Sequence, residues 1–382
     1  MDNSPKLYTP TFLLLSASHF LFAASFAMII PELPSYLASL GGGEYKGLII
    51  SLFTLTAGLS RPFSGKLTDT IGRRPVLIIG TLVCVVCSLF YPLISSVFGF
   101  LALRFVHGFS TGFKPTANIA YVADIVPEHR RGEAMGIMGM CMNAGGSIAP
   151  PIGSWLTNQY NIDFMFYSSS FVALLSVLIL LTLKETLPKT RPFTRSLLIL
   201  KKTEIIDSSA IAPAIITLLT YFAFGGMLTI VPDQTVHLGM TNKGLYMTSF
   251  TAMIVASRLI GGRLADIYGR TIVIKWGTLI MMLSLLMFGY SWSPSTLLLF
   301  SGFVGIGYGL IGPAIFAWAT DLSDPNHRGR AFATVYIALE AGIGLGALLS
   351  AWFYDDNPQL FAHFFIVCAF ICLLGLIFMW KR

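Results

Sequence analysis

The sequence RPFSGKLTDTIGR at residues 61–73 returns as RLIGGRLADIYGR at residues 258–270, an offset of 197 positions. Arginine, glycine, aspartate and a Gly-Arg pair recur at matching places in the two copies. Asp124 returns as Asp321 at the same offset. An internal repeat of this length indicates two related halves that share one order of secondary-structure elements.

The composition around this repeat is that of a membrane protein. Of 382 residues, 55% are hydrophobic and 11% are charged, and the mean hydropathy is +0.74. A soluble domain has roughly 25% charged residues, and a water-soluble fold of this length cannot bury so many apolar side chains. The lipid bilayer must therefore solvate much of the chain.

Apolar stretches of about 20 residues, each long enough to cross a bilayer, recur along the whole chain. They lie near residues 12–34, 47–69, 75–96, 98–123, 131–157, 164–183, 210–233, 244–267, 271–292, 295–320, 329–353 and 360–380. The sequence thus predicts an all-α membrane protein with twelve transmembrane helices in two pseudo-symmetric six-helix bundles. We expect an N-terminal bundle at residues 1–187, a cytoplasmic linker at 188–208 and a C-terminal bundle at 209–382.

The distribution of basic residues predicts the orientation. One set of alternate connections, together with the termini, holds eighteen lysines and arginines, whereas the other set holds only Lys46 and Lys243. Basic residues concentrate on the cytoplasmic side of membrane proteins. Both termini are therefore expected in the cytoplasm, in a multi-pass protein of the inner membrane. The net charge of +7 reflects this topology and does not indicate a nucleic-acid partner.

Cofactor and enzyme chemistry find little support in the residues. The five cysteines all lie inside apolar stretches, and the pair Cys84 and Cys87 has no second pair or histidine cluster to complete a metal site. No phosphate-binding G-x-x-x-x-G-K-[ST] loop occurs. We therefore expect no metal, no cofactor and no catalytic residues.

The repeated loop resembles a known family signature. Residues 65–74, GKLTDTIGRR, look like the loop between spans 2 and 3 of the major facilitator superfamily, and residues 262–270 look like its second copy. RFVHG at residues 104–108, with Gly112, resembles the arginine-glycine motif of proton-coupled members of that superfamily.

Span 5 resembles the glycine-proline motif of the drug/proton antiporter branch. The matching residues are Gly145, Ala149, Pro150 and Gly153, with Ala149 and Ser154 standing where glycines are usual. The resemblance implies alternating-access transport, and often efflux driven by the proton gradient. The expected partners are a small-molecule substrate, protons and the lipid bilayer, and the protein is expected to be a monomer.

Both copies of the loop carry matching small and charged residues at the predicted cytoplasmic ends of spans 2 and 8. We call this set the latch: Gly65, Asp69, Gly72, Arg73, Arg74, Gly262, Asp266, Gly269 and Arg270. A carboxylate there can accept hydrogen bonds from the free N–H groups at a neighbouring helix N-terminus. The latch is expected to close the cytoplasmic side when the bundles rock. The alternative is a role in topology and turn formation only.

Span 4 carries a polar stripe. Its members, which share one helical face, are Arg104, His107, Thr111, Lys114 and Asn118. A charge that faces lipid costs about 2.5–3.5 kcal/mol, so this face should meet a wet cavity or a partner helix. We expect Arg104 to line a central cavity and to contact substrate or Glu340. Lys114 and His107 are further candidates.

Glu340, near the middle of span 11, is the leading candidate for proton coupling. Gly342, Gly346 and Ser350 lie on the opposite side of the helix, so Glu340 should face away from that packing surface, beside Tyr336. A carboxyl group in a membrane can take up a proton because desolvation disfavours its charged form. A structural pair with Arg104 or Lys114 is the alternative.

Weaker candidates complete the set. Asn143 occupies the position of Glu340 in the first half, and His19 on span 1 is a possible titrating group. Arg61 and its repeat Arg258 suggest a structural role at the inner ends of spans 2 and 8. Glu32 and Asp233 follow prolines at the outer ends of spans 1 and 7, which suggests an outer gate or helix capping.

The substrate stays open at this level. The cavity candidates carry more positive than negative charge, and Glu32, the only acid in the first predicted span, lies at the membrane edge. This weakens a cationic-drug interpretation. Proton-coupled uptake of a sugar or an anionic or zwitterionic metabolite, and export of a metal-chelating metabolite, remain alternatives to drug efflux.

Overall fold

The structure is a computed structural model that describes residues 7–127, 130–194, 197, 206–323, 328–355 and 357–380. Within these residues the regular structure is helical throughout. The helices of the first half are α1 (Pro10–Ile29), η1 (Ile30–Glu32), α2 (Leu33–Ser39), η2 (Gly43–Tyr45), α3 (Lys46–Thr68), α4 (Arg73–Phe90), η3 (Tyr91–Leu93), α5 (Val97–His107), α6 (Phe109–Ile125), α7 (Arg131–Gln159) and α8 (Ile162–Thr182). Those of the second half are η7 (Ser208–Ala210), α9 (Ile211–His237), α10 (Leu245–Tyr268), α11 (Arg270–Gly289), α12 (Pro294–Leu322), α13 (Arg328–Tyr354), η8 (Pro358–Leu360) and α14 (Phe361–Trp380).

These helices make twelve passes, as the apolar stretches predict. The first pass runs through α1, η1 and α2, and the fourth is divided at Gly108 into α5 and α6. The predicted fold class, two six-helix bundles, is therefore confirmed. Part of the expected linker, with most of residues 195–205, lies outside the described residues.

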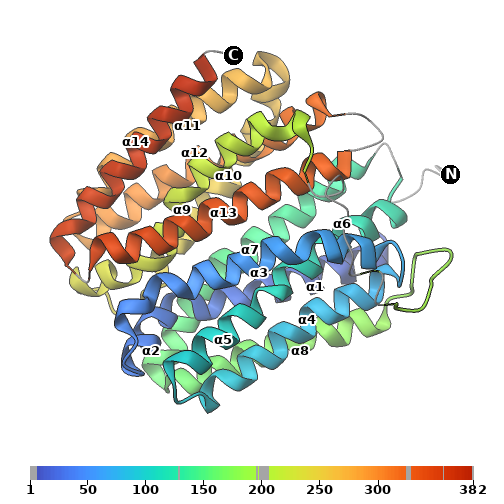
Figure 1. The fold of residues 1–382 in the computed structure, drawn as a ribbon, viewed down its shortest axis with the longest axis horizontal. Helices are drawn as coiled ribbons and strands as arrows, with labels where there is room; N and C mark the ends of the chain where they lie inside the picture. Colours follow the sequence, from blue (N-terminus) through green and yellow to red (C-terminus); the bar gives the residue numbers. More distant parts are fainter. Residues whose placement is uncertain are drawn as a thin grey trace.

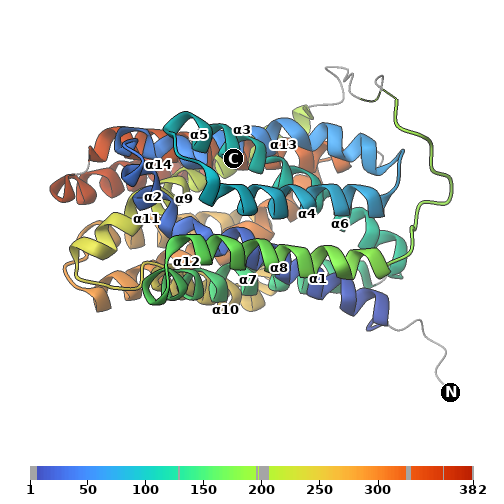
Figure 2. The ribbon, with the colours of Figure 1, turned by 90° about the horizontal axis from the view of Figure 1, so that it is seen from below.

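The two halves form separate bundles that meet along two seams (Figures 1 and 2). One seam joins α3 to α13, and the other joins α7 to α10. The helices lie along one common axis, and the start of α1 and the end of α14 are at the same end of the molecule (Figure 1). We call this the termini end of the molecule and the opposite one the far end.

Three of the four seam helices are more polar than most of the other passes. Eight of the described passes are long and apolar enough to cross a membrane by composition alone, and they do not include α3, α7 or α10. Those three helices form most of the two seams. Polar groups on a membrane helix are expensive in contact with lipid, so these helices place them between the halves.

The loop after each repeated aspartate needs a glycine. Gly72 has φ of 123° and Gly269 has φ of 93°, which side chains other than glycine rarely adopt. Each glycine directly precedes a helix, α4 or α11. The Gly-Arg pair of the repeat is thus fixed by backbone geometry in both halves.

Glycines also decide which helices touch. A side chain at Gly112 would collide with Ser60 of α3, one at Gly145 would meet Phe20 of α1, and one at Gly346 would meet Phe222 of α9. Small residues of this kind let helix backbones approach closely in membranes. The predicted packing faces on spans 5 and 11 are confirmed, since α7 packs on α1 and α13 packs on α9.

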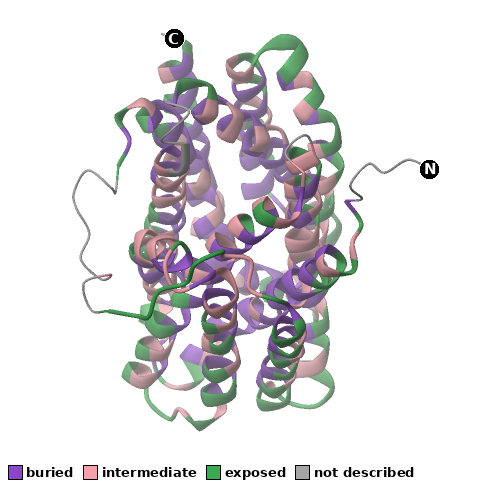
Figure 3. Cartoon of the chain, turned by 90° about the vertical axis from the view of Figure 1, so that its right-hand side faces the viewer, coloured by how far each residue is buried: buried purple, intermediate pink, exposed green. Residues whose placement is uncertain are grey.

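The outside of the molecule is apolar. Buried residues gather between the helices, while exposed ones cover the outer sides (Figure 3). Among the exposed side chains, Trp292 is 72% accessible, Trp352 81% and Trp380 77%. Tryptophan is enriched at membrane–water interfaces, which agrees with a protein that has lipid around it.

Candidate functional site

An ion pair crosses the α3–α13 seam. The Arg61 Nη2 atom lies 2.6 Å from the Glu340 Oε1 atom, and only 10% and 9% of the two side chains are exposed. The Arg61 guanidinium also lies over the Tyr336 ring, 4.4 Å from its centroid. Gly58 leaves room for this contact, because a Cβ atom there would be 3.4 Å from that of Glu340. Glu340 thus faces away from α9, as predicted.

Arg104 is not the partner of Glu340, and this expectation was wrong. Its Nε atom donates to the Ile49 carbonyl at 3.0 Å, and its Nη1 atom donates to the Tyr91 hydroxyl at 3.3 Å. Its guanidinium lies 4.6 Å from the centre of the Phe53 ring, and the residue is 2% exposed. Arg104 therefore ties α5 to α3 within the first half.

The rest of the span 4 stripe also faces the interior of its own half. The Lys114 ammonium donates to the Ser18 carbonyl at 3.0 Å, to the Ser18 hydroxyl at 2.9 Å and to the Ser176 hydroxyl at 2.7 Å. His107 contacts the Tyr91 hydroxyl at 3.1 Å and the Cys84 sulfur at 3.2 Å. The three ammonium donors of Lys114 are thus satisfied without a carboxylate.

Close helix packing explains this correction. Gly108 keeps helical φ and ψ values of −58° and −28°, and the five residues of the stripe are all buried. A side chain at Gly108 would collide with the Phe53 carbonyl of α3, and this tight contact turns the stripe toward α1, α4 and α8. His19 of α1 is likewise buried, at 6% exposure, and its Nδ1 atom has no partner among the described residues.

The α7–α10 seam carries the counterpart of the ion pair. Arg258 of α10 is the repeat of Arg61, and Asn143 of α7 is the repeat of Glu340. The Arg258 Nη1 atom would lie 3.5 Å from a Cβ atom at Gly139, one turn from Asn143. The Arg258 Nε and Asn143 Nδ2 atoms are buried and have no hydrogen-bond partner in the described part of the chain. The arginine charge on the α3–α13 seam is therefore neutralised, and the arginine charge on the α7–α10 seam has no ion-pair partner among the described residues.

Two reciprocal ion pairs join the halves at the far end. Lys243 of the second half lies 2.9 Å from Glu32 of the first, and Lys46 of the first half lies 2.9 Å from Asp233 of the second. Glu32 also accepts a hydrogen bond from the Ser154 hydroxyl at 2.7 Å. The acids were expected to form an outer gate or to cap helices, and their partners across the interface agree with the first alternative.

The latch residues pair within each half in this conformation. Arg73 donates to Asp69 at 2.7 Å and to Asp124 at 3.1 Å. In the second half Arg270 pairs with Asp266 and, at 3.3 Å, with Asp321. Arg73 and Arg270 thus each pair with two acids of their own half, while closure of one half against the other stays a prediction.

Glu185, and not Asp69, accepts the hydrogen bonds from the N–H groups at the start of α4. The Arg73 and Arg74 backbone N–H groups, at the start of α4, donate to the two carboxylate oxygens of Glu185 at 2.9 and 3.0 Å. The Arg74 side chain donates to the Leu181 carbonyl at 2.7 Å. Glu185 is missing from the second-half repeat, so self-comparison could not reveal it.

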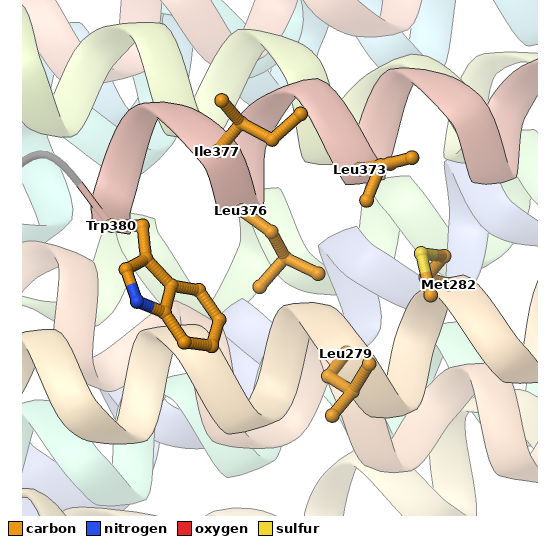
Figure 4. A pocket seen from close by; sticks show the side chains of 6 residues that line it. All are labelled: Leu279, Met282, Leu373, Leu376, Ile377 and Trp380. Carbon is orange, nitrogen blue, oxygen red and sulfur yellow. The ribbon is translucent and has the colours of Figure 1, made fainter.

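The two grooves found on the described surface lie away from the ion pair. One, of about 370 Å³, runs between α11 and α14 on the side turned away from the first half (Figure 4). Its lining is apolar and consists of Leu279, Met282, Leu373, Leu376, Ile377 and Trp380. The other, of about 140 Å³, lies at the far end beside Lys46 and Asp233.

Sequence reasoning undervalued Arg61 and Arg258 as site residues. Both are charged side chains inside a span, where a charge in lipid is costly, and both recur at an offset of 197. Lys46 and Lys243 recur at the same offset. A search for duplicated charges, rather than for single charges, would have singled out all four.

Comparison with known proteins places this geometry in a family. The family model described as Major Facilitator Superfamily matches residues 15–232 and 213–382. The chain is 26% identical to multidrug resistance protein 2 of Bacillus subtilis (97% of this chain and 95% of that protein covered) and 28% identical to multidrug resistance protein MdtG of Serratia proteamaculans (94% and 90%).

Among solved structures, the human organic anion transporter MFSD10 superposes with a TM-score of 0.75 at 18% identity, with 97% of this chain and 100% of that chain covered. A POT family transporter in complex with 5-aminolevulinic acid reaches 0.80 at 15% identity, with 97% and 96% covered. These structures share the fold. The chain belongs to the major facilitator superfamily of membrane transport proteins.

Proposed function

We propose that this protein exports a small molecule across the cytoplasmic membrane by alternating access, with proton entry as the driving force. The observation that carries the proposal is the buried ion pair between Arg61 and Glu340, which joins the two halves. A pair in this place links the charge of one carboxyl group to the relative position of the bundles.

Protonation would act as the switch. When Glu340 gains a proton, its carboxyl group becomes neutral and no longer compensates the Arg61 guanidinium. A buried charge that loses its partner is strongly destabilised, so the contact between α3 and α13 weakens and the halves can separate there. Glu340 takes this proton from the outside while the far end is open, and its release to the cytoplasm after the far end closes restores the pair, so one proton moves inward in each cycle.

The ends of the molecule would serve as alternate gates. In this conformation the pairs of Glu32 with Lys243 and of Lys46 with Asp233 hold the far end together. We propose that the far end is the outer one, because the basic connections lie at the termini end and should be cytoplasmic. The latch would engage when the molecule closes at that end.

The relatives support export. The proteins named as multidrug resistance proteins in Bacillus and Serratia are similar along nearly their whole length. The glycine-proline stretch of span 5 packs α7 on α1, where side chains at Gly145 and Gly153 would meet the Phe20 and Met28 carbonyls.

A transport assay in proteoliposomes tests the proposal. Ethidium and a fluorescent quinolone would serve as probes, with a pH gradient as the energy source. Wild-type protein should accumulate at least one probe against its gradient, and Glu340→Gln should still exchange it but not accumulate it. Glu133→Gln is the matched control, because Glu133 is an exposed acid paired only with nearby Arg130. Full gradient-driven accumulation by Glu340→Gln would refute the coupling role.

A further inference from the structure

We propose that the α7–α10 seam binds the anionic group of the transported solute, and that Arg258 and Asn143 form this site. The proposal rests on the proposed transport function and names the substrate class: small organic molecules that carry a carboxylate or a similar anion.

The position of the Arg258 guanidinium is the first argument. Arg258 is a residue of the second half, yet its Nη1 atom would be 3.5 Å from a Cβ atom at Gly139 in the first half. Its Nη2 atom would be 3.4 Å from a Cβ atom at Gly312 of α12. Glycines on two helices thus flank the guanidinium and leave it room between the halves.

The missing counter-charge is the second argument. On the α3–α13 seam the charge of Arg61 is neutralised by Glu340. On the α7–α10 seam the repeat of Glu340 is Asn143, which carries no charge. Arg258 has no ion-pair partner among the described residues, so the pseudo-symmetric set of two arginines and one glutamate keeps one excess positive charge.

Unsatisfied donors at this seam are the third argument. The Arg258 Nε and Asn143 Nδ2 atoms are both buried and lack partners in the described part of the structure; Arg61 Nε is also unsatisfied, so the free Asn143 amide is what distinguishes this seam. Asn143 lies one helical turn from Gly139, the residue that the guanidinium approaches. Buried donors without partners are rare in native proteins and call for an explanation such as a missing ligand. An anion would accept from both.

The geometry fits a carboxylate better than a cation. A guanidinium presents a planar fork that binds a carboxylate through two parallel hydrogen bonds, and the Asn143 amide adds a third donor. A cationic solute would meet the uncompensated charge of Arg258 and be repelled. Tyr221 of α9, whose ring packs on Phe224 and Tyr308, lies within electrostatic range of Arg258.

The proposed site lies nearer the termini end of the molecule than the far end. Above it, the Thr248 hydroxyl donates to the Ser147 carbonyl at 2.6 Å and holds α7 against α10. Arg258 lies ten residues further along α10, which is about 15 Å of helix. The proposed site is therefore on the side of this contact that faces the termini end, as an exporter loading from the cytoplasm requires.

Binding of two matched probes tests the inference. Naphthalene-1-carboxylate and 1-naphthylmethylammonium share a ring system and differ in charge, and calorimetry on the purified full-length protein measures both. Wild type should prefer the carboxylate, and Arg258→Gln should weaken its binding about 10- to 100-fold, as expected for a lost charge-assisted hydrogen bond. Asn143→Ala should weaken it less. Lys275→Gln is the control, because Lys275 contacts Trp380 on a different face.

Arg258→Lys keeps the charge without the fork and gives a second variant if Arg258→Gln does not fold. Equal carboxylate affinity in wild type, Arg258→Gln and Arg258→Lys would overturn the inference, as would a preference of wild type for the ammonium. If ethidium is moved by the pH gradient but the carboxylate does not bind, the anion site is wrong and the transport proposal stands. If the carboxylate binds through Arg258 but no probe is transported, the transport proposal is wrong and the anion site stands.

Discussion

Separation of the Arg61–Glu340 pair should shift the balance between the two access states. We consider a double-mutant cycle with Arg61→Gln, Glu340→Gln and the combined variant. Either single change removes one charge from a pair of 2.6 Å that is about nine-tenths buried and spans the two halves. The double variant leaves two neutral amides, which can hydrogen-bond with each other.

The expected change in free energy between the two access states follows from the burial of the pair. Removal of one partner from a buried ion pair costs about 3–5 kcal/mol. After Glu340→Gln, however, Arg61 keeps its contact with the Tyr336 ring, which is worth about 0.5–2 kcal/mol. A net cost of about 1–4.5 kcal/mol in the state with the seam closed corresponds to a shift of about 5- to 2,000-fold in the equilibrium between states.

The assay reads this equilibrium directly. In a protein whose five native cysteines are replaced, a single cysteine is introduced at Gly132, near the termini end, where a side chain meets no other atom within 4 Å. A second protein carries one at Ala38, an exposed residue of α2 at the far end. Labelling rates with a membrane-impermeant maleimide in oriented vesicles then report which end is accessible. Each single variant should change the ratio of the two rates, and the double variant should restore part of it.

The coupling energy decides the outcome. If the pair acts as proposed, the double variant should differ from the sum of the single variants by more than about 1 kcal/mol, beyond the usual error of additivity. Additive effects, or single variants with wild-type labelling ratios, would show that the pair does not link the halves energetically. The proton-coupling role of Glu340 would then lose its structural basis.

Three further predictions concern other contacts of the molecule. Asp69→Asn removes a largely exposed partner of Arg73, so it should change stability by less than about 1 kcal/mol. It should also lower transport and raise labelling at the termini end. Unchanged labelling with full transport would refute the latch hypothesis. Arg104→Lys should lower the thermal unfolding temperature because an ammonium cannot reproduce the forked contacts. The solute affinity per folded molecule should stay constant. A loss of affinity at constant stability would indicate that Arg104 belongs to the binding site. Glu32→Lys places two cations together at the far end and should raise labelling there, and Lys243→Glu in the same molecule should reverse the effect; failure of this rescue would refute the gate.

The fold was predictable from the chain alone because its determinants are local or repetitive. Apolar length fixes the number of passes, since every backbone polar group in lipid must be satisfied within a helix. The repeat fixes two like halves, and Gly72 and Gly269 adopt the φ values that only glycine takes easily. The packing faces of α7 and α13 were also predictable, because glycines at helical spacing mark a close contact whatever the partner is.

The direction of a side chain around its own helix was predictable too. Glu340 lies opposite Gly342 and Gly346, and the structure has it facing away from α9. Periodicity supplies this angle because each residue turns the helix by about 100°. It held for α13 and for the span 4 stripe, whose five residues are all buried, but it did not reveal that the stripe faces the interior of its own half.

Only the tertiary structure decided which helix meets each face. Arg61 and Glu340 are 279 positions apart, and nothing in the local pattern of either residue selects the other. Arg104 and Arg61 are equally cationic and equally placed inside a span, but tight packing of α6 against α3 turns Arg104 inward, whereas Arg61 faces the opposite half. Hydrophobicity and helical period specify how each helix is oriented toward lipid or core, whereas the partner of a buried charge depends on the joint packing of all the helices around it.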